Sequence, residues 1–225
     1  MEKDLFFAGI DAGSRTINAA LYDARQGKVR ATALCDQGVD QSGRASRLLH
    51  DLLARQGLQL SRLRGLVATG YGRHAIAAAG TPLATVTEIT CHARGVRHFH
   101  PQAAALIDIG GQDSKLVRLA GDGRVRDFVM NDRCAAGTGR FLEVVAQRLE
   151  TPLEELGALA AAADRPVTIS SMCVVFAESE IIGLLAAGEK PANIVAGVQQ
   201  AIASRVAAMT GGRLPGSVYL TGGVA

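Results

Sequence analysis

Two cysteines occupy positions that suit metal-ligand chemistry. Cys134 lies in the segment 131–139 and Cys173 in the segment 170–178, and each stands just before a predicted helix. An iron–sulfur cluster is usually held by four thiolates, and a two-fold dimer brings the same patch of each copy together. Two cysteines per subunit at such an axis would make one four-cysteine site, and helix N-termini there favour a negatively charged group.

Core packing is the competing explanation, because a cysteine side chain behaves as a small hydrophobe. Zinc sites usually contain closely spaced ligand pairs such as Cys-x-x-Cys, and the sequence contains no such pair. Cys91 and His92 are adjacent, but they fall in a helix predicted over 86–98, where neighbouring side chains point about 100° apart. We expect Cys35 and Cys91 to be packing residues. For Cys134 and Cys173 the residues alone leave packing and cluster binding both open.

The composition is typical of a compact globular protein. Its 225 residues are 48% hydrophobic and 20% charged, with a net charge of +3 and interspersed acids and bases. This pattern, with 4% aromatic residues and no tryptophan, argues against nucleic-acid binding. The N-terminus lacks a signal-peptide pattern, and the stretch of small and apolar residues at 156–163 is too short to cross a bilayer. The cysteines form no disulfide-scaffold pattern. We expect a cytoplasmic protein that binds neither nucleic acid nor membrane.

The predicted elements occur in the same order twice. In the first half they are strands at 5–10, 17–22 and 29–34, a helix at 42–56 and a strand at 65–69. In the second half they are strands at 104–109, 115–120 and 125–130, helices at 138–150 and 152–162, a strand at 167–170, helices at 176–187 and 191–211, and a strand at 217–221. A shift of 97 positions places Ile10-Asp-Ala-Gly13 on Ile107-Asp-Ile-Gly110. We predict a duplicated α/β fold with two lobes, 1–101 and 102–225.

In each copy an aspartate ends a hydrophobic strand and a glycine-containing turn follows. Asp11 precedes the first turn and Asp108 the second. Glycine lets backbone N–H groups approach an anion closely, and a strand-end carboxylate can hold Mg²⁺ against nucleotide phosphates, usually through water. An ordinary hairpin turn explains one copy alone equally well, whereas two equivalent copies favour phosphate binding. The sequence has neither a P-loop nor a dinucleotide fingerprint.

Six motifs spread over essentially the whole chain carry a family resemblance. They are Ile10-Asp-Ala-Gly-Ser14, Ala68-Thr-Gly-Tyr-Gly-Arg73, Ile107-Asp-Ile-Gly-Gly-Gln-Asp113, Met130-Asn-Asp-Arg-Cys-Ala-Ala-Gly-Thr-Gly-Arg-Phe141, Phe176-Ala-Glu-Ser-Glu180 and Thr221-Gly-Gly-Val-Ala225. Together they resemble the ATP-dependent activators (component A) of 2-hydroxyacyl-CoA dehydratases and the related ATP-hydrolysing subunits of benzoyl-CoA reductase. The broader kinship is to the duplicated ribonuclease-H-like fold of actin, Hsp70 and sugar kinases, which implies two lobes with ATP in the cleft.

The resemblance implies a homodimer in which Cys134 and Cys173 of each subunit hold one shared [4Fe-4S] cluster. A ferredoxin or flavodoxin would reduce the cluster, ATP and Mg²⁺ would drive a rearrangement around it, and one electron would pass to a 2-hydroxyacyl-CoA dehydratase. For one electron about 59 mV corresponds to about 1.4 kcal/mol, so an uphill step of about 300 mV needs on the order of 7 kcal/mol. A nucleotide-driven switch between two states can supply that amount.

The resemblance also assigns roles at the nucleotide. Strand-end carboxylates would position Mg²⁺ and water, a glutamine would orient the attacking water, and two sets of turns would hold the phosphates and the adenosine. The catalytic residues are Asp11, Asp108 and Gln112, and the binding residues are Gly13, Ser14, Gly110, Gly111, Lys115, Gly222 and Gly223. A plain turn glutamine and a strand-ending glycine pair are the alternatives. Glu178 and Glu180 are expected to favour the helix dipole and not to act in catalysis.

Two departures from the family pattern accompany these matches. The first phosphate turn of the family commonly continues with a threonine and later a lysine, where this chain has Arg15 and Asn18. Arg15 is the candidate replacement for the missing cation. Family members also continue past Ala225 with a segment that packs the adenine pocket, so we expect a truncated chain that lacks about 30–40 residues.

Three other classes of protein stay open at this point. The first is the ATPase subunit of a benzoyl-CoA-type reductase, which would share the cluster. The second is a small-molecule kinase of the same superfamily, and the third is a chaperone-like or sensor ATPase. Neither of the last two needs the paired cysteines, so the presence of a cluster separates them from the activator.

Overall fold

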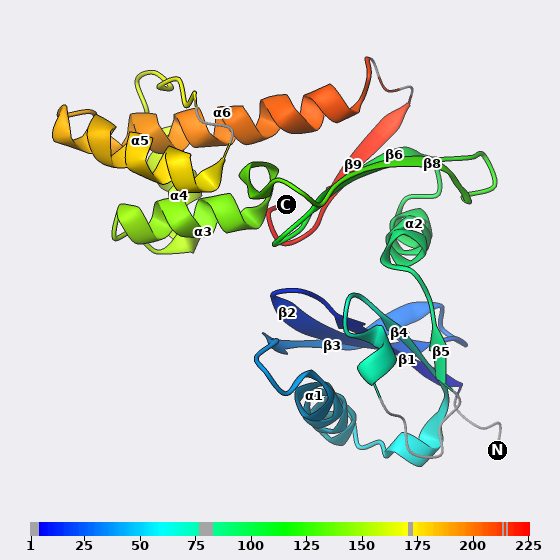
Figure 1. Cartoon of the computed structure of the whole chain (residues 1–225). Helices are drawn as coiled ribbons and strands as arrows, with labels where there is room; N and C mark the ends of the chain where they lie inside the picture. The colour runs from blue at the N-terminus through cyan, green and yellow to red at the C-terminus, as the bar shows by residue number, and fades with distance from the viewer. Residues whose placement is uncertain (1–4, 77–82, 171–172, 213, 215) are drawn as a thin grey trace. The chain divides into compact units, whose positions relative to one another are not determined.

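The computed structural model describes residues 5–76, 83–170, 173–212, 214 and 216–225. The chain divides into two compact units, Met1–His92 and Ala93–Ala225, and Figure 1 labels many of their helices and strands. Ser171 and Met172, which precede Cys173 in the second cysteine motif, lie outside the described residues. Among the described residues, no helix combines the length and the apolar character needed to cross a membrane.

The first unit is built on a five-stranded mixed sheet. Its strands lie in the order β3-β2-β1-β4-β5, with β1 antiparallel to β2 and parallel to β4. The elements are β1 (Phe6–Ala12), β2 (Thr16–Asp23), β3 (Lys28–Asp36), α1 (Gln41–Arg55), the 3-10 turn η1 (Leu60–Arg62), β4 (Leu63–Thr69), the 3-10 turn η2 (Arg73–Ala75), β5 (Leu83–Thr85) and the start of α2 (Glu88–Phe99).

The period of the hydrophobic residues explains how this unit folds. Alternate residues of β1 and β2 are buried, which is the two-residue period of a strand with one packed face. In α1 the buried Ala45, Leu49, Leu52 and Leu53 recur at helical spacing and join the same core. Asp40 caps this helix by accepting from Gly43 N at 2.9 Å. One face of the sheet is therefore packed against α1.

The second unit has a four-stranded mixed sheet and a set of helices. The strand order is β8-β7-β6-β9, with β6 antiparallel to β7 and parallel to β9. The elements are the remainder of α2, β6 (Ala103–Ile109), β7 (Ser114–Leu119), β8 (Val125–Asn131), η3 (Ala135–Gly137), α3 (Gly139–Arg148), η4 (Leu153–Glu155), α4 (Leu156–Ala161), α5 (Val174–Ala186), α6 (Pro191–Met209) and β9 (Ser217–Thr221). Helices α3 to α6 lie together as a group in Figure 1.

The core of the second unit lies among these helices. Phe141 and Val145 of α3, Ile181 of α5 and Ile194 of α6 are each 0% exposed and belong to one cluster. The cluster also contains Ile109, the last residue of β6. The end of the central strand is thus fixed against the helices that follow the two cysteine motifs.

The structure confirms the duplicated strand order and corrects it in two places. The strand predicted at 167–170 is wrong, because the described residues there are irregular and Val167 N donates to Asn193 O at 3.1 Å. This hydrogen bond ties the segment to the start of α6 and not to a sheet. The short strand β5 was not predicted, and the helix predicted over 152–162 is divided into η4 and α4.

Candidate functional site

The first strand-end aspartate lies in a tightly closed turn. Asp11 is near the end of β1 and pairs with Asn18 of β2 and Thr69 of β4. Gly13 N donates to Thr16 O at 3.0 Å and closes the turn. Gly70 follows β4 at φ +82°, and a Cβ there would lie 2.4 Å from Asp11 Oδ1. Only glycine allows the backbone to pass so close to this carboxylate.

The second aspartate is in the same setting. Asp108 pairs with Lys115 of β7 and Thr221 of β9, and Gly110 N donates to Asp113 O at 2.9 Å. Gly222 follows β9 at φ +94°, and a Cβ there would lie 2.6 Å from Asp108 Oδ1. The Thr221 hydroxyl donates to the same oxygen at 3.4 Å. The repeat seen in the sequence is therefore also a repeat of backbone geometry.

The second turn differs from the first by a buried group of three charges. Lys115 Nζ donates to Asp113 Oδ1 at 2.7 Å and to Asp108 Oδ2 at 3.2 Å. The side chains of Lys115, Asp108 and Asp113 are 3%, 2% and 7% exposed. Buried charges are tolerated when they are paired and hydrogen-bonded. We call these residues the charge triad, which has two carboxylates for one ammonium and so a formal net charge of −1.

The remaining residues expected at the nucleotide lie at the surface of their turns. Ser14, Gly110 and Gly111 are half-buried, and Gln112, Gly222 and Gly223 are exposed. Gln112 is thus available to a molecule outside the turn. Arg15, the candidate replacement cation, is exposed and forms an ion pair with Asp36 at 3.3 Å. Lys115, which the resemblance assigns to nucleotide binding, is enclosed in the charge triad.

Cys134 is held in a loop by the side chain of one residue. Asn131 Nδ2 donates to Cys134 O at 3.0 Å, and Cys134 N donates to Asn131 Oδ1 at 3.3 Å. The loop then forms η3 and enters α3, so the half-buried cysteine precedes a helical segment as predicted. None of the chain's four cysteines, all of which the structure describes, forms a disulfide. The Asn131 clamp was not predicted, although Asn131 stands within the cysteine motif.

Cys173 is exposed and directly precedes α5. The preceding segment is anchored to that helix, because Ser170 N and Oγ donate to Glu180 Oε1 at 2.9 and 2.8 Å. Glu178 forms an ion pair with Arg148 of α3. The two glutamates that were left outside catalysis therefore hold the second cysteine motif and join the two helices that follow the cysteines.

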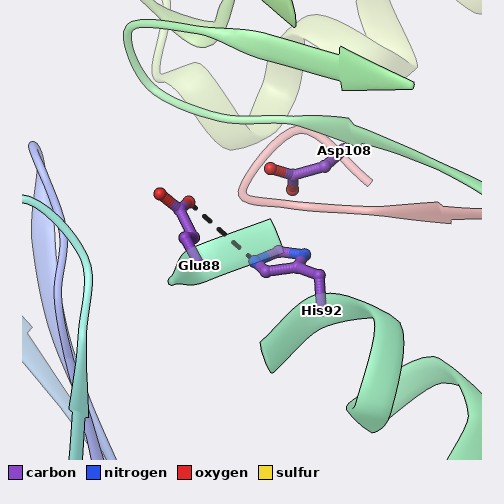
Figure 2. Close-up of side chains that lie close together, drawn as sticks. All are labelled: Glu88, His92 and Asp108. Atoms are coloured by element: carbon purple, nitrogen blue, oxygen red, sulfur yellow. Dashed lines mark ion pairs between the residues drawn. The ribbon is translucent and has the colours of Figure 1, made fainter. Parts of the chain in front are cut away.

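The two cysteines that are expected to be packing residues are both in the first unit. Cys35 lies against its core, as predicted. Cys91 is on α2 and lines a cavity of about 580 Å³ together with Asp11, Asn18 and Thr69. Burial raises the pKa of the Cys91 thiol, an effect opposed by its hydrogen bond to Thr69 and reinforced by the charges of Asp11 and Glu88. On the same helix Glu88 and His92 form an ion pair at 3.9 Å, which Figure 2 shows as a dashed line.

Solved structures show the class of fold to which these units belong. The chain superposes with a TM-score of 0.89 and 36% identity on component A of the (R)-2-hydroxyglutaryl-CoA dehydratase of Acidaminococcus fermentans, covering 98% of this chain and 83% of that one. The activator of the 2-hydroxyisocaproyl-CoA dehydratase from Clostridium difficile, solved with bound ADPNP, gives a TM-score of 0.89 and 37% identity over 98% of this chain and 81% of that one. The fold is thus the duplicated fold of the actin, Hsp70 and sugar-kinase superfamily, as the sequence predicts.

The sequence comparison identifies the family within that class. Residues 8–225 match the model of the BadF/BadG/BcrA/BcrD ATPase family. The chain is 42% identical over 223 residues to the activator of lactoyl-CoA dehydratase from Anaerotignum propionicum, an alignment that covers 98% of this chain and 84% of the relative. The chain therefore belongs to the BadF/BadG/BcrA/BcrD ATPase family.

Proposed function

We propose that this protein is an ATP-hydrolysing activator that passes a low-potential electron to a 2-hydroxyacyl-CoA dehydratase. Its relatives named as dehydratase activators support this activity. The observation that carries the proposal is the placement of Cys134 and Cys173 in one unit, each at the start of a helical segment. The helices that follow, α3 and α5, share a core and are joined by the Arg148–Glu178 pair.

The two cysteines suit an iron–sulfur cluster in their chemistry. Thiolates are the soft ligands that such clusters prefer, and two thiols per chain require a second copy for a four-thiolate set. The exposed face of α5 next to Cys173 supports such a copy, since Val175, Phe176 and Ile182 are 67%, 69% and 50% exposed. A [4Fe-4S] cluster held there by Cys134 and Cys173 of both copies would supply one-electron transfer. A ferredoxin or flavodoxin is the electron donor in this proposal.

The nucleotide roles are assigned to the two turns. Asp11 and Asp108 would hold Mg²⁺ and water, Gln112 would orient the attacking water, and the turns after β1 and β6 would receive the phosphates through backbone N–H groups. Gly222 and Gly223 would face the adenosine. In this proposal each of the lobes 1–101 and 102–225 contributes one phosphate turn, and the protein would work in the cytoplasm. Lys115 would act at the phosphates only through the charge triad.

Anaerobic purification with iron analysis and visible and EPR spectra tests the proposal. The protein should contain roughly four irons per dimer, and Cys134→Ser or Cys173→Ser should abolish the cluster, because each change removes two ligands from a symmetric dimer and a hydroxyl is a poor ligand for soft iron. Cys35→Ser and Cys91→Ser are the matched controls and should keep the iron. Full iron content in Cys134→Ser would overturn the bridging model.

A shared cluster also links the metal to the dimer. It contributes binding energy only when both copies are present, so an iron chelator should bleach the protein and weaken its self-association in sedimentation. Unchanged sedimentation of iron-free protein would assign the interface to side-chain packing alone. Mixing the reduced protein and ATP with candidate acceptors would then separate a dehydratase partner from a benzoyl-CoA-type reductase.

A further inference from the structure

Backbone hydrogen bonds connect the second phosphate turn to the start of α3. Gly139 N donates to Gly110 O and Arg140 N donates to Gly111 O, both at 2.9 Å. These acceptors belong to the turn whose N–H groups are assigned to phosphate. A Cβ at Gly139 would lie 3.3 Å from Gly110 O and 3.2 Å from Val224 Cγ2, which is tighter than most side-chain contacts. Gly139 therefore allows the helix to approach the turn this closely.

Two neighbouring strands hold the loop that lies between this helix and Cys134. Ser114 of β7 and Asn131 of β8 are partners in the sheet register. The hydroxyl of Ser114, which is 1% exposed, donates to Gly137 O, while Asn131 clamps both backbone groups of Cys134. Ser114 also directly follows Asp113 of the charge triad. The Cys134 loop is therefore bonded on one side to the strands and on the other to the phosphate turn.

We infer that Ser114, Asn131 and Gly139 are positioning residues that make the second phosphate turn and the Cys134 loop one hydrogen-bonded unit, so that nucleotide at the turn changes the surroundings of the Cys134 thiol. The inference rests on the proposed nucleotide role of this turn. A ligand shifts such a unit only as far as it binds one arrangement better than another. Gly110 and Gly111 can connect the two, because their turn is assigned to phosphate while their carbonyl groups accept hydrogen bonds from the start of α3.

Cys173 provides an internal comparison. Its described contacts are local, since Ser170 is anchored to Glu180 of the helix that Cys173 begins. The inference therefore predicts that nucleotide changes the reactivity of Cys134 much more than that of Cys173. A general loosening of the protein would change both cysteines together, which separates the two explanations.

The test uses thiol labelling of the 225-residue chain, purified in air and freed of iron. Labelling by a maleimide is quantified at each cysteine by mass spectrometry, with and without ADPNP and Mg²⁺. The rate at Cys134 should change by about fivefold or more, the lower range of measured couplings between sites. The rate at Cys173 should change by less than about twofold. Because no metal is involved, this result is independent of the cluster proposal.

Three variants examine the connection itself. Gly139→Ala should reduce the nucleotide effect at Cys134 to within about twofold of unity, because the new methyl group separates the helix from Gly110 O. Gly157→Ala is the matched control, since Gly157 is also in the first turn of a helix and a Cβ there meets nothing within 4 Å. Ser114→Ala and Asn131→Asp should each reduce the effect partly. Melting temperatures and nucleotide binding are measured for every variant, so that loss of folding is recognised.

The outcomes separate the two proposals. The inference is overturned if Gly139→Ala folds and binds nucleotide but still shows the full nucleotide effect on the labelling rate of Cys134. It is also overturned if bound nucleotide does not change the labelling rate of Cys134 in the parent protein. Protein that shows the Cys134 effect but contains no iron after anaerobic purification overturns the cluster and supports the inference. Failure to bind ADPNP would overturn both.

Discussion

The two units place an aspartate in the same backbone setting and surround it with different charges. Positions 11, 16 and 18 of the first turn correspond to 108, 113 and 115 of the second at the shift of 97. In the first turn Asn18 Nδ2 donates to Thr16 Oγ1 at 3.3 Å, a hydrogen bond between neutral groups. In the second the same two positions carry Lys115 and Asp113. Duplication has kept the geometry, while the electrostatics of the two turns have diverged.

The two turns keep a carboxylate at the strand end in different electrostatic settings. A lysine buried beside one aspartate would neutralise it, and Asp113 restores the negative charge of the group. In the proposed role at Mg²⁺, Asp108 would therefore keep a second carboxylate beside it, although Lys115 Nζ lies 3.2 Å away. Asp11 needs no second carboxylate beside it, because the position that corresponds to Lys115 in the first turn is the neutral Asn18.

The largest expected effect comes from breaking the charge triad. Lys115→Met should lower the free energy of unfolding by about 3–5 kcal/mol, because it leaves two buried carboxylates without their ammonium. Asn18→Ala, the equivalent change in the first unit, should cost only about 0.5–1.5 kcal/mol for a neutral hydrogen bond. Urea unfolding of both variants measures the comparison. Equal losses would show that the triad is no more important to folding than its neutral counterpart.

Placing the neutral residues of the first turn at the equivalent positions of the second turn tests the comparison further. The double variant Asp113→Thr with Lys115→Asn carries the residues of positions 16 and 18, and it removes one carboxylate together with the ammonium. It should be more stable than Lys115→Met by at least about 1 kcal/mol, since residues in one network couple by about 0.5–3 kcal/mol. The exposed Arg118–Asp127 pair on the same sheet is the control, and its removal should change stability by at most about 1 kcal/mol. A double variant less stable than Lys115→Met would contradict the charge argument.

Replacing the two strand-end aspartates should have the same effect on ATPase activity but different effects on stability. Asp11→Asn and Asp108→Asn should each lower ATPase activity by at least about tenfold, equivalent to about 1.4 kcal/mol in the transition state, while iron content stays unchanged. Only Asp108→Asn should also lower the urea midpoint clearly, because it takes a carboxylate from buried Lys115. Activity assays and unfolding curves on the same preparations decide this. ATPase rates unaffected by both changes would show that the turns are ordinary hairpins.

The smallest effect concerns the cysteine beside the first turn. Because burial raises the pKa of Cys91, its thiol should stay protonated at a pH where an exposed thiol has begun to ionise, and native Cys91 should react with a maleimide more slowly than the unfolded protein. A raised native pKa stabilises the fold below the unfolded pKa, and that contribution is lost as pH rises through the native value. The native rate should therefore approach the unfolded rate in alkaline solution. Equal rates at pH 8 would contradict this picture.

The sequence predicted the parts of the molecule that depend on local pattern. Strand-end aspartates, glycine turns and the helices after the cysteines follow from periodicity and short motifs, and the family resemblance covered the whole chain. The strand expected at 167–170 failed because a short apolar run carries no information about its partner. Here that partner is Asn193 of α6.

The details of the site depended on contacts that no local pattern reveals. Whether Lys115 meets solvent or two carboxylates is decided by the packing around β6 and β7, so its enclosure could not be read from its position in the motif. The clamp by Asn131 and the anchor by Glu180 arise in the same way, from side chains that turn back onto their own loops. The helix-to-turn hydrogen bonds at Gly110 and Gly111 join segments about 30 residues apart in the chain.

The parallel pairing of β9 with β6 sets the order in which the two turns can form during synthesis. The first sheet is complete once β5 has left the ribosome at residue 85, whereas the second needs residues 217–221 to pair beside 103–108. Contacts so distant in sequence form slowly, because a long loop must close before they are made. The hydrogen bond from Thr221 to Asp108 spans 113 residues, so the second turn is finished last. A nascent chain arrested before residue 217 should contain a protease-resistant first unit and an incomplete second one.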